Sequence, residues 1–280
     1  MNPRTLLISV LFIVMSVSRA HADTGWISDG GSVHLLGENG SISMESEVVN
    51  IRVSKNLVEA DCLFKFVNNG PACTVRMGFP DQCSDERDSD DGSPKGAFLS
   101  YKSFIDGKEV KTETLKGGWD NGAYTVWHAN DVSFDANGRR EIRNIYTVCP
   151  GFAAVSEKGY AAKCVAYTLH TASSWRGKIH DGVVSFNFDG DVIPLPVELV
   201  EEKNSAVDKS ARYDWQRAKP GTLVFTSALS PVVEGNSIQF KFKNFRPSTK
   251  DDIFIFYGRM GKGEATRFVR MVEKTYAKSK

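Results

Sequence analysis

A two-residue rhythm of apolar side chains recurs along this chain and limits what it can fold into. Apolar residues stand at every second position from Val58 to Phe66, and Glu59, Asp61 and Lys65 lie among the residues between them. Because successive side chains of a strand point to opposite faces, this alternation predicts a strand with one buried face. A second run, Cys73–Phe79, follows turn residues at 68–71, and the two runs are interpreted as a hairpin.

Further strand patterns follow at short intervals. They are found over Ala97–Ile105, Lys108–Thr114, Ala123–His128, Glu141–Cys149, Cys164–Thr171, Val183–Phe188, Ile193–Val200, Thr222–Ser227, Ser237–Phe245 and Asp252–Tyr257. Many short strands with turn signals and little helix predict a mainly β protein. We expect an antiparallel β-sandwich, built as one large unit or two consecutive ones, with a C-terminal helix.

The helix is predicted from the tail. Phe268, Val272 and Tyr276 recur at four-residue spacing, which places them on one face of an amphipathic helix within 259–280. The polar stretch 201–212 is interpreted as a possible linker. The expected organisation is therefore a β-sandwich domain over 23–200 and further strands of the same or a second unit over 213–258.

The N-terminus carries the pattern of a secretory signal peptide. Arg4 precedes an apolar run, Leu6–Val17, which ends shortly before Ala20-His21-Ala22. We expect residues 1–22 to be removed by cleavage after Ala22, and the product to be secreted or periplasmic. No later run is long and apolar enough to predict a transmembrane segment.

Charge excludes one class of partner. Without the two signal arginines, Arg4 and Arg19, the chain keeps 33 basic and 34 acidic residues. Phosphate backbones are bound by an excess of Lys and Arg, so no nucleic-acid partner is expected.

Five cysteines follow the signal: Cys62, Cys73, Cys83, Cys149 and Cys164. Export permits disulfides, and an odd number leaves one thiol over. Cys149 and Cys164 are the preferred pair, because each borders a strand pattern and 14 residues lie between them. Closing such a loop contributes about 3 kcal/mol in the chain-entropy model.

An acidic segment over 81–91 is a candidate calcium site. Its acidic residues are Asp81, Asp85, Glu86, Asp88, Asp90 and Asp91. Calcium prefers such oxygen ligands, but the spacing of an EF-hand loop is not met. A solvated loop is the main interpretation, and a calcium-stabilised module is the alternative.

The stretch 170–181 is a candidate hydrolytic site. It contains His170, Ser173, Ser174, His180 and Asp181, the residue types of a catalytic triad. No G-x-S-x-G elbow is present, and hydroxyls in such a connection more often bond the local backbone. We therefore assign no catalytic residue, and an envelope hydrolase stays an alternative.

No metal or other cofactor is predicted. The four histidines after the signal form no H-x-x-x-H or H-E-x-x-H pair; they are His34, His128, His170 and His180. A ligand groove could instead use aromatic rings, which in a sandwich are more often core residues. The candidates are Trp119, Tyr124, Trp127, Trp175 and Trp215.

Several short motifs carry a resemblance to known sequences. They are Phe104-Ile105-Asp106-Gly107, the run from Tyr167 to Gly177, and Asn244-Phe245-Arg246-Pro247 before Asp251-Asp252-Ile253. The chain resembles a group of exported bacterial proteins that contain a β-rich domain of unknown function, although Ala172 stands where that group tends to have Gly. The resemblance implies an exported β-rich fold and no active-site residue.

Together these patterns predict a secreted β-sandwich protein of the bacterial envelope or exterior. Its expected role is that of a non-enzymatic binding or structural module with an unidentified protein or glycan partner. Edge strands and loops are expected to provide the binding surface.

Overall fold

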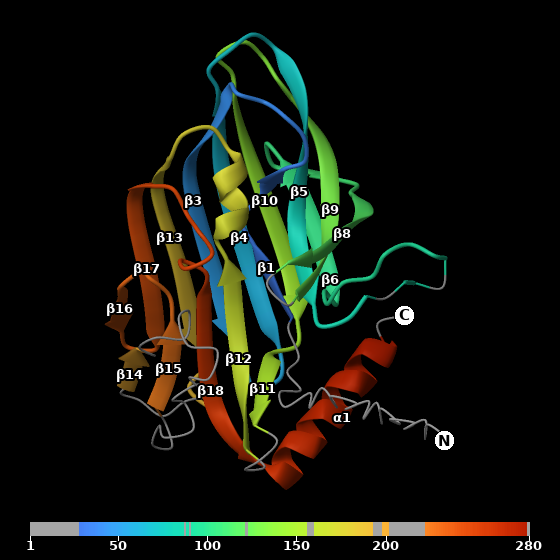
Figure 1. Ribbon diagram of the computed structural model, residues 1–280, viewed down its shortest axis with the longest axis vertical. Helices are drawn as coiled ribbons and strands as arrows, with labels where there is room; N and C mark the ends of the chain where they lie inside the picture. Colours follow the sequence, from blue (N-terminus) through green and yellow to red (C-terminus); the bar gives the residue numbers. More distant parts are fainter. Residues whose placement is uncertain are drawn as a thin grey trace, which may run out of the picture.

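A computed structural model describes residues 28–86, 88–89, 91–120, 123–155, 160–192, 198–201 and 222–278. In this part of the chain, two β-sheets pack face to face and one α-helix lies at the lower end of the view in Figure 1. The prediction of a mainly β, two-layered fold with a C-terminal helix is confirmed. The predicted signal peptide, most of the linker at 201–212 and Trp215 lie outside the described residues.

One layer, sheet A, has the strand order β14-β15-β18-β12-β1-β5-β9-β8, with β11 on β12 and β2 on β5. Its strands are β1 (Ser28–Gly31), β2 (His34–Leu35), β5 (Cys73–Cys83), β8 (Glu113–Asp120), β9 (Ala123–Phe134), β11 (Gly151–Val155), β12 (Tyr160–Thr168), β14 (Glu198–Glu201), β15 (Thr222–Thr226) and β18 (Ile253–Gly261).

The other layer, sheet B, has the order β16-β17-β13-β3-β4-β10-β6-β7. Its strands are β3 (Ile42–Val53), β4 (Val58–Asn68), β6 (Ser100–Ile105), β7 (Lys108–Val110), β10 (Arg139–Val148), β13 (Ile179–Phe188), β16 (Pro231–Glu234) and β17 (Ser237–Phe245). Strands from residues 222–261 complete both sheets, so this part of the chain shares its layers with the earlier strands.

The pairing differs from the predicted one in two ways. Both sheets are mixed, because β1–β12, β3–β13 and β14–β15 are parallel pairs. The predicted hairpin of 58–66 with 73–79 is wrong: β4 belongs to sheet B and β5 to sheet A. The turn at 68–71 therefore carries the chain from one layer to the other. The predicted turn at Asp106-Gly107 does join a hairpin, β6–β7, with both residues at positive φ.

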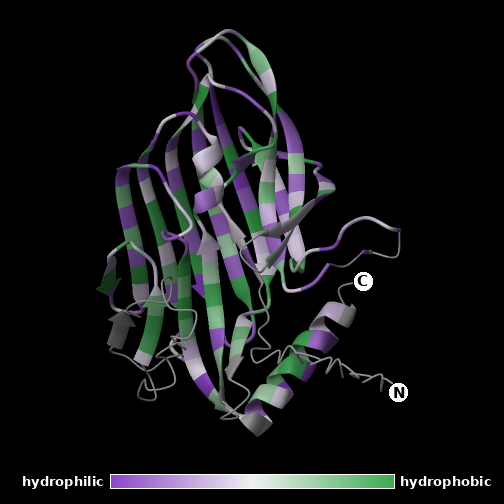
Figure 2. Cartoon of the chain, viewed as in Figure 1, coloured by the Kyte–Doolittle hydropathy of each residue, from purple (hydrophilic) through white to green (hydrophobic). Residues whose placement is uncertain are grey.

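The core lies between the sheets and is rich in aromatic rings. Apolar and polar residues alternate along the strands, as Figure 2 shows, and the apolar set faces the other sheet. The largest fully buried side chains include Phe64, Phe66, Phe79, Tyr146, Tyr167, Phe186, Phe188 and Phe240. The two inner faces thus form one continuous hydrophobic layer.

Helix α1 (Lys262–Lys278) follows β18 directly. The predicted stripe of Phe268, Val272 and Tyr276 is buried, and the Tyr276 hydroxyl donates to the Ala97 carbonyl at 2.7 Å. The stripe packs on Cys149, Ala161 and Met260, so the helix covers one end of the sheets. No helix in the described ranges has the length and apolar character needed to cross a bilayer.

Candidate functional site

The stretch 170–181 begins with a short 3₁₀ helix, η1 (His170–Ser174), and continues into β13. His170 is held by Asp252, the residue that precedes β18. Asp252 Oδ2 lies 2.6 Å from His170 Nδ1, and its Oδ1 accepts from the backbone N–H groups of Leu169 and His170 at 2.8 and 2.9 Å. This carboxylate therefore anchors the end of β12 to the start of β18.

Of the two serines of this stretch, Ser174 bonds the backbone through its hydroxyl, as the sequence predicts. Ser174 Oγ donates to the Thr171 carbonyl at 3.1 Å and accepts from the Leu35 N–H at 2.9 Å. His180 is exposed on β13, and Asp181 pairs with Lys243 at 3.5 Å. His170, Ser174 and Asp181 thus each have a different partner. The Ser174 hydroxyl has a structural role at η1.

The acidic segment is likewise bound to protein groups. Asp81 is buried and accepts from Ala97 N, Phe98 N and His128 Nε2 at 2.5 to 3.3 Å. Lys116 contacts both Glu86 and Asp88, and Asp91 accepts from Ser93. Among the described residues, no group of three or more His, Cys, Asp or Glu side chains is placed to hold a metal ion. Asp90 lies outside the described residues.

The predicted disulfide between Cys149 and Cys164 is not formed, and no disulfide joins any two of the five cysteines. Cys149 packs beneath helix α1, whereas Cys164 packs with Ala162, Val224 and Phe256 in a separate cluster. Adjacent strand positions face opposite sides of a sheet, and sequence spacing alone does not show which side each thiol takes. Burial raises the pKa of both thiols, which keeps them protonated and unreactive.

The aromatic candidates do not line a common groove in the described part of the chain. Trp175 and Tyr124 are core residues, and Trp127 stacks on His34 with ring centroids 5.0 Å apart. Trp119 on the sheet edge is 60% exposed and contacts Tyr124 edge-on.

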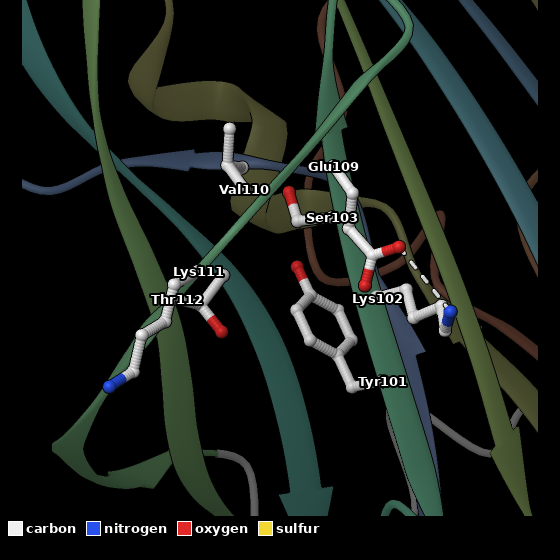
Figure 3. A pocket seen from close by; sticks show the side chains of 7 residues that line it. All are labelled: Tyr101, Lys102, Ser103, Glu109, Val110, Lys111 and Thr112. Atoms are coloured by element: carbon white, nitrogen blue, oxygen red, sulfur yellow. Dashed lines mark hydrogen bonds and ion pairs between the residues drawn. The ribbon is translucent and has the colours of Figure 1, made fainter.

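A hollow that the sequence did not indicate lies where the chain crosses from sheet B to sheet A. It has a volume of about 340 Å³, and we call it the edge hollow. Its lining residues are Tyr101, Lys102, Ser103, Glu109, Val110, Lys111 and Thr112 (Figure 3). Lys102 and Glu109 form an ion pair at 3.3 Å on its rim, and Lys111 is exposed.

Polar side chains hold the floor of the edge hollow in place. The Tyr101 ring stacks on His128 with centroids 4.1 Å apart, and its hydroxyl donates to Asn144 Oδ1 at 2.9 Å. Asn130 lies 3.1 Å from the Ser103 hydroxyl and, with its nitrogen toward the backbone, donates to the Lys111 carbonyl at 2.9 Å. These bonds connect β6 and β10 of sheet B with β9 of sheet A.

Burial also shapes the chemistry of this floor. It raises the pKa of the Tyr101 phenol, so the hydroxyl stays protonated and keeps its donor role. A second small cavity shares Tyr101 and Ser103 with the edge hollow and extends to His128, Asn130 and Asn144. The floor therefore continues as a polar strip into the sandwich.

The sequence did contain a signal for this strip. Ser103, His128, Asn130 and Asn144 occupy positions of their strands that share parity with core residues. Polar side chains at inward positions need hydrogen-bond partners, which they find in one another here. In the sequence, the apolar residues at the other inward positions obscure these polar exceptions.

Two further carboxyl groups are buried between or beside the sheets. Glu47 on β3 accepts from Ser32 Oγ and Tyr167 OH at 2.5 and 2.8 Å, and burial raises its pKa to about 7. Asp29 on β1 is buried and neither of its oxygens has a hydrogen-bond partner, and burial raises its pKa well above the usual value. Both groups favour the neutral form in this environment.

Comparison with known proteins supports the fold. No protein-family model matches the chain, and no curated protein matches it. A solved structure from Legionella pneumophila, provisionally named a nutrient binding protein, aligns with a TM-score of 0.55 at 17% identity, over 83% of this chain and 71% of that one. An M1 zinc metallopeptidase from Deinococcus radiodurans aligns with a TM-score of 0.33 at 7% identity over 77% of this chain, which spans 42% of the peptidase.

Proposed function

We propose that this protein is an exported, non-enzymatic binding module of the bacterial envelope or exterior. The signal-like N-terminus and the resemblance to exported β-rich proteins support export. The provisional name of the Legionella pneumophila structure fits a binding role. The Ser174 hydroxyl donates its proton to the Thr171 carbonyl rather than to a histidine, which disfavours the hydrolase alternative.

We propose the edge hollow as the binding site, and small hydroxylated molecules such as sugars as its ligand class. The observation that carries this proposal is its lining: one aromatic ring stands among hydroxyl, ammonium and carboxylate groups in a space of about 340 Å³. Sugar hydroxyls both donate and accept hydrogen bonds, so a sugar can use the Thr112 hydroxyl and the Lys102–Glu109 pair together (Figure 3). The volume is that of a small-molecule site.

The fixed floor favours such a ligand further. Tyr101 and Ser103 are held by Asn144 and Asn130, so little side-chain freedom is lost when a ligand binds. The Lys102–Glu109 pair is exposed on the rim. There each of the two side chains can replace its contact with the other by a hydrogen bond to a ligand hydroxyl. The site therefore combines a rigid base with adaptable edges.

Calorimetric titration of the full chain with a panel of mono- and disaccharides tests this proposal. We expect saturable binding of at least one sugar, and we expect Lys102→Met and Thr112→Val each to weaken it at least fivefold. Lys108→Met is the matched control, because Lys108 is exposed on the same hairpin and does not line the hollow.

Two results would overturn the proposal. The absence of binding to every sugar in the panel rejects the ligand class. Binding that neither lining variant weakens rejects the site. A reducing-end assay on the bound sugar adds a direct test of the non-enzymatic role, since release of new reducing ends contradicts it.

A further inference from the structure

A second hollow lies on sheet B, away from the edge hollow, and carries an excess of positive charge. It has a volume of about 440 Å³ and is formed by β3, β4, β10 and the turn that enters β13. We call it the basic groove. Its charged and titratable lining residues are Glu45, Arg139, Arg176, Lys178 and His180.

The one carboxylate in the basic groove is already neutralised. Both oxygens of Glu45 accept from Arg139, with distances from 2.9 to 3.2 Å, and this hydrogen bonding lowers the pKa of Glu45. Arg176 and Lys178 form no ion pair among the described residues, and both are exposed. Within the described part of the chain, the groove therefore keeps two cations that have no ion-pair partner.

Two arginines further along the strands of the groove differ from these cations. Arg52 on β3 and Arg143 on β10 each pair with a carboxylate, Asp189 and Asp61, at 3.0 and 2.6 Å. Two cations without partners beside a neutralised pair instead raise the local concentration of anions.

The backbone below these cations is firmly anchored. The buried Trp175 indole donates to the Val33 carbonyl at 2.6 Å, and its ring packs on Phe66 with centroids 4.6 Å apart. The Arg176 N–H donates to the Ile42 carbonyl at 3.1 Å. Gly177 then takes a φ of +77°, which turns the chain so that Lys178 follows on the same rim.

We infer that the basic groove binds a small molecule through an oxyanion, such as a carboxylate or phosphate group. The Arg176 guanidinium offers a planar fork of donors that matches two oxygens, and the Lys178 ammonium adds a second charge. This site is separate from the edge hollow and does not depend on its ligand.

Calorimetric titration of the full chain with inorganic phosphate and with citrate, at low salt, tests this inference and separates the two sources of the oxyanion. We expect saturable binding of at least one anion, at least tenfold weaker binding by the Arg176→Ala/Lys178→Ala double variant, and weaker binding as sodium chloride rises.

Arg176→Lys/Lys178→Arg keeps the charges and is expected to retain most of the affinity. Lys241→Ala, exposed on β17 outside the groove, is the control.

Glu45→Gln gives a second test that does not remove a lining cation. It frees the Arg139 guanidinium, so anion affinity is expected to rise several-fold. Absence of binding to both anions overturns the inference, as does binding that the double variant leaves unchanged. Weaker binding by Glu45→Gln contradicts the charge argument in particular.

Discussion

The Glu47 carboxylate and the Tyr167 phenol meet between the two sheets, where the phenol oxygen lies 2.8 Å from Glu47 Oε1. Ser32 donates to the same oxygen at 2.5 Å, and Oε2 has no partner. The bonds to Oε1 lower the pKa of Glu47, but burial outweighs them, so its pKa rises from 4.5 to about 7. This pair links β3 of sheet B to β12 of sheet A through a group whose charge depends on pH.

We predict that Glu47 makes the protein less stable as pH rises. The folded state holds the Glu47 proton up to about pH 7, whereas the unfolded chain loses it near pH 4.5. Its contribution is therefore present below pH 4.5 and is lost as pH rises through 7, by about 3 kcal/mol in total. Glu47→Gln, which cannot ionise, is expected to raise the free energy of unfolding relative to the parent at pH 8 and to change it little at pH 4.5.

Urea denaturation at several pH values checks this prediction. Glu59→Gln is the control, because Glu59 is exposed on the adjacent strand β4. A difference between Glu47→Gln and the parent that does not vary with pH contradicts the assignment.

We predict that Gly182 on β13 tolerates no side chain. A Cβ at this position would lie 2.0 Å from the buried Phe242 ring on the paired strand β17. Gly182→Ala is therefore expected to lower the free energy of unfolding by roughly 1–3 kcal/mol, since the ring must leave its position. Gly190→Ala, where no atom lies within 4 Å of the new Cβ, is expected to stay within about 0.5 kcal/mol of the parent. Equal melting temperatures for the two variants would show that Phe242 moves freely.

We predict that the folded protein contains no disulfide bond. Without reductant, a maleimide is expected to label the thiols slowly in the native state and five per chain after denaturation. Burial and the raised pKa of Cys62, Cys149 and Cys164 explain the slow native reaction. Mass spectrometry of unreduced peptides is the measurement, and a linked Cys149–Cys164 peptide would contradict this structure.

We predict that Asp252 contributes more to stability than its partner His170. Asp252→Ala leaves the N–H groups of Leu169 and His170 without their acceptor, in addition to the imidazole. Leaving two such groups without a partner is expected to lower the free energy of unfolding, measured by urea denaturation, by roughly 2–6 kcal/mol. His170→Ala removes the imidazole contact and leaves both backbone bonds, so a smaller loss is expected. The reverse order of the two variants would assign the main role to the imidazole.

The alternation of side chains predicted the strands well and their partners poorly. Ser237–Phe245 has the predicted bounds, and the helical stripe at Phe268, Val272 and Tyr276 is buried as expected. Period-two alternation shows which face of a strand is buried, but both sheets bury a face, so it does not show which sheet a strand joins. For this reason the pattern predicts a hairpin of 58–66 with 73–79, although the two strands lie in opposite layers.

The candidate sites were harder to predict, for a related reason. The floor of the edge hollow depends on Tyr101, His128 and Asn144, which come together only after β6 and β10 pair in sheet B and β9 of sheet A packs against them. The stretch 170–181 is a candidate site in the sequence because of its Ser, His and Asp residues. In the structure, its Arg176 and Lys178 side chains are instead the notable ones, because they form no ion pair among the described residues. A local catalytic motif can be recognised in the sequence. An unpaired charge can be recognised only in the structure, where the positions of its possible partners are known.

The parallel pairs β1–β12 and β3–β13 constrain the order in which this protein can fold. Each joins a strand from the first 53 residues to one that begins at residue 160 or later. A chain emerging from its N-terminus therefore lacks the central partners of both layers until more than half of it is available. Fragments that end before Tyr160 are therefore expected to show no cooperative melting.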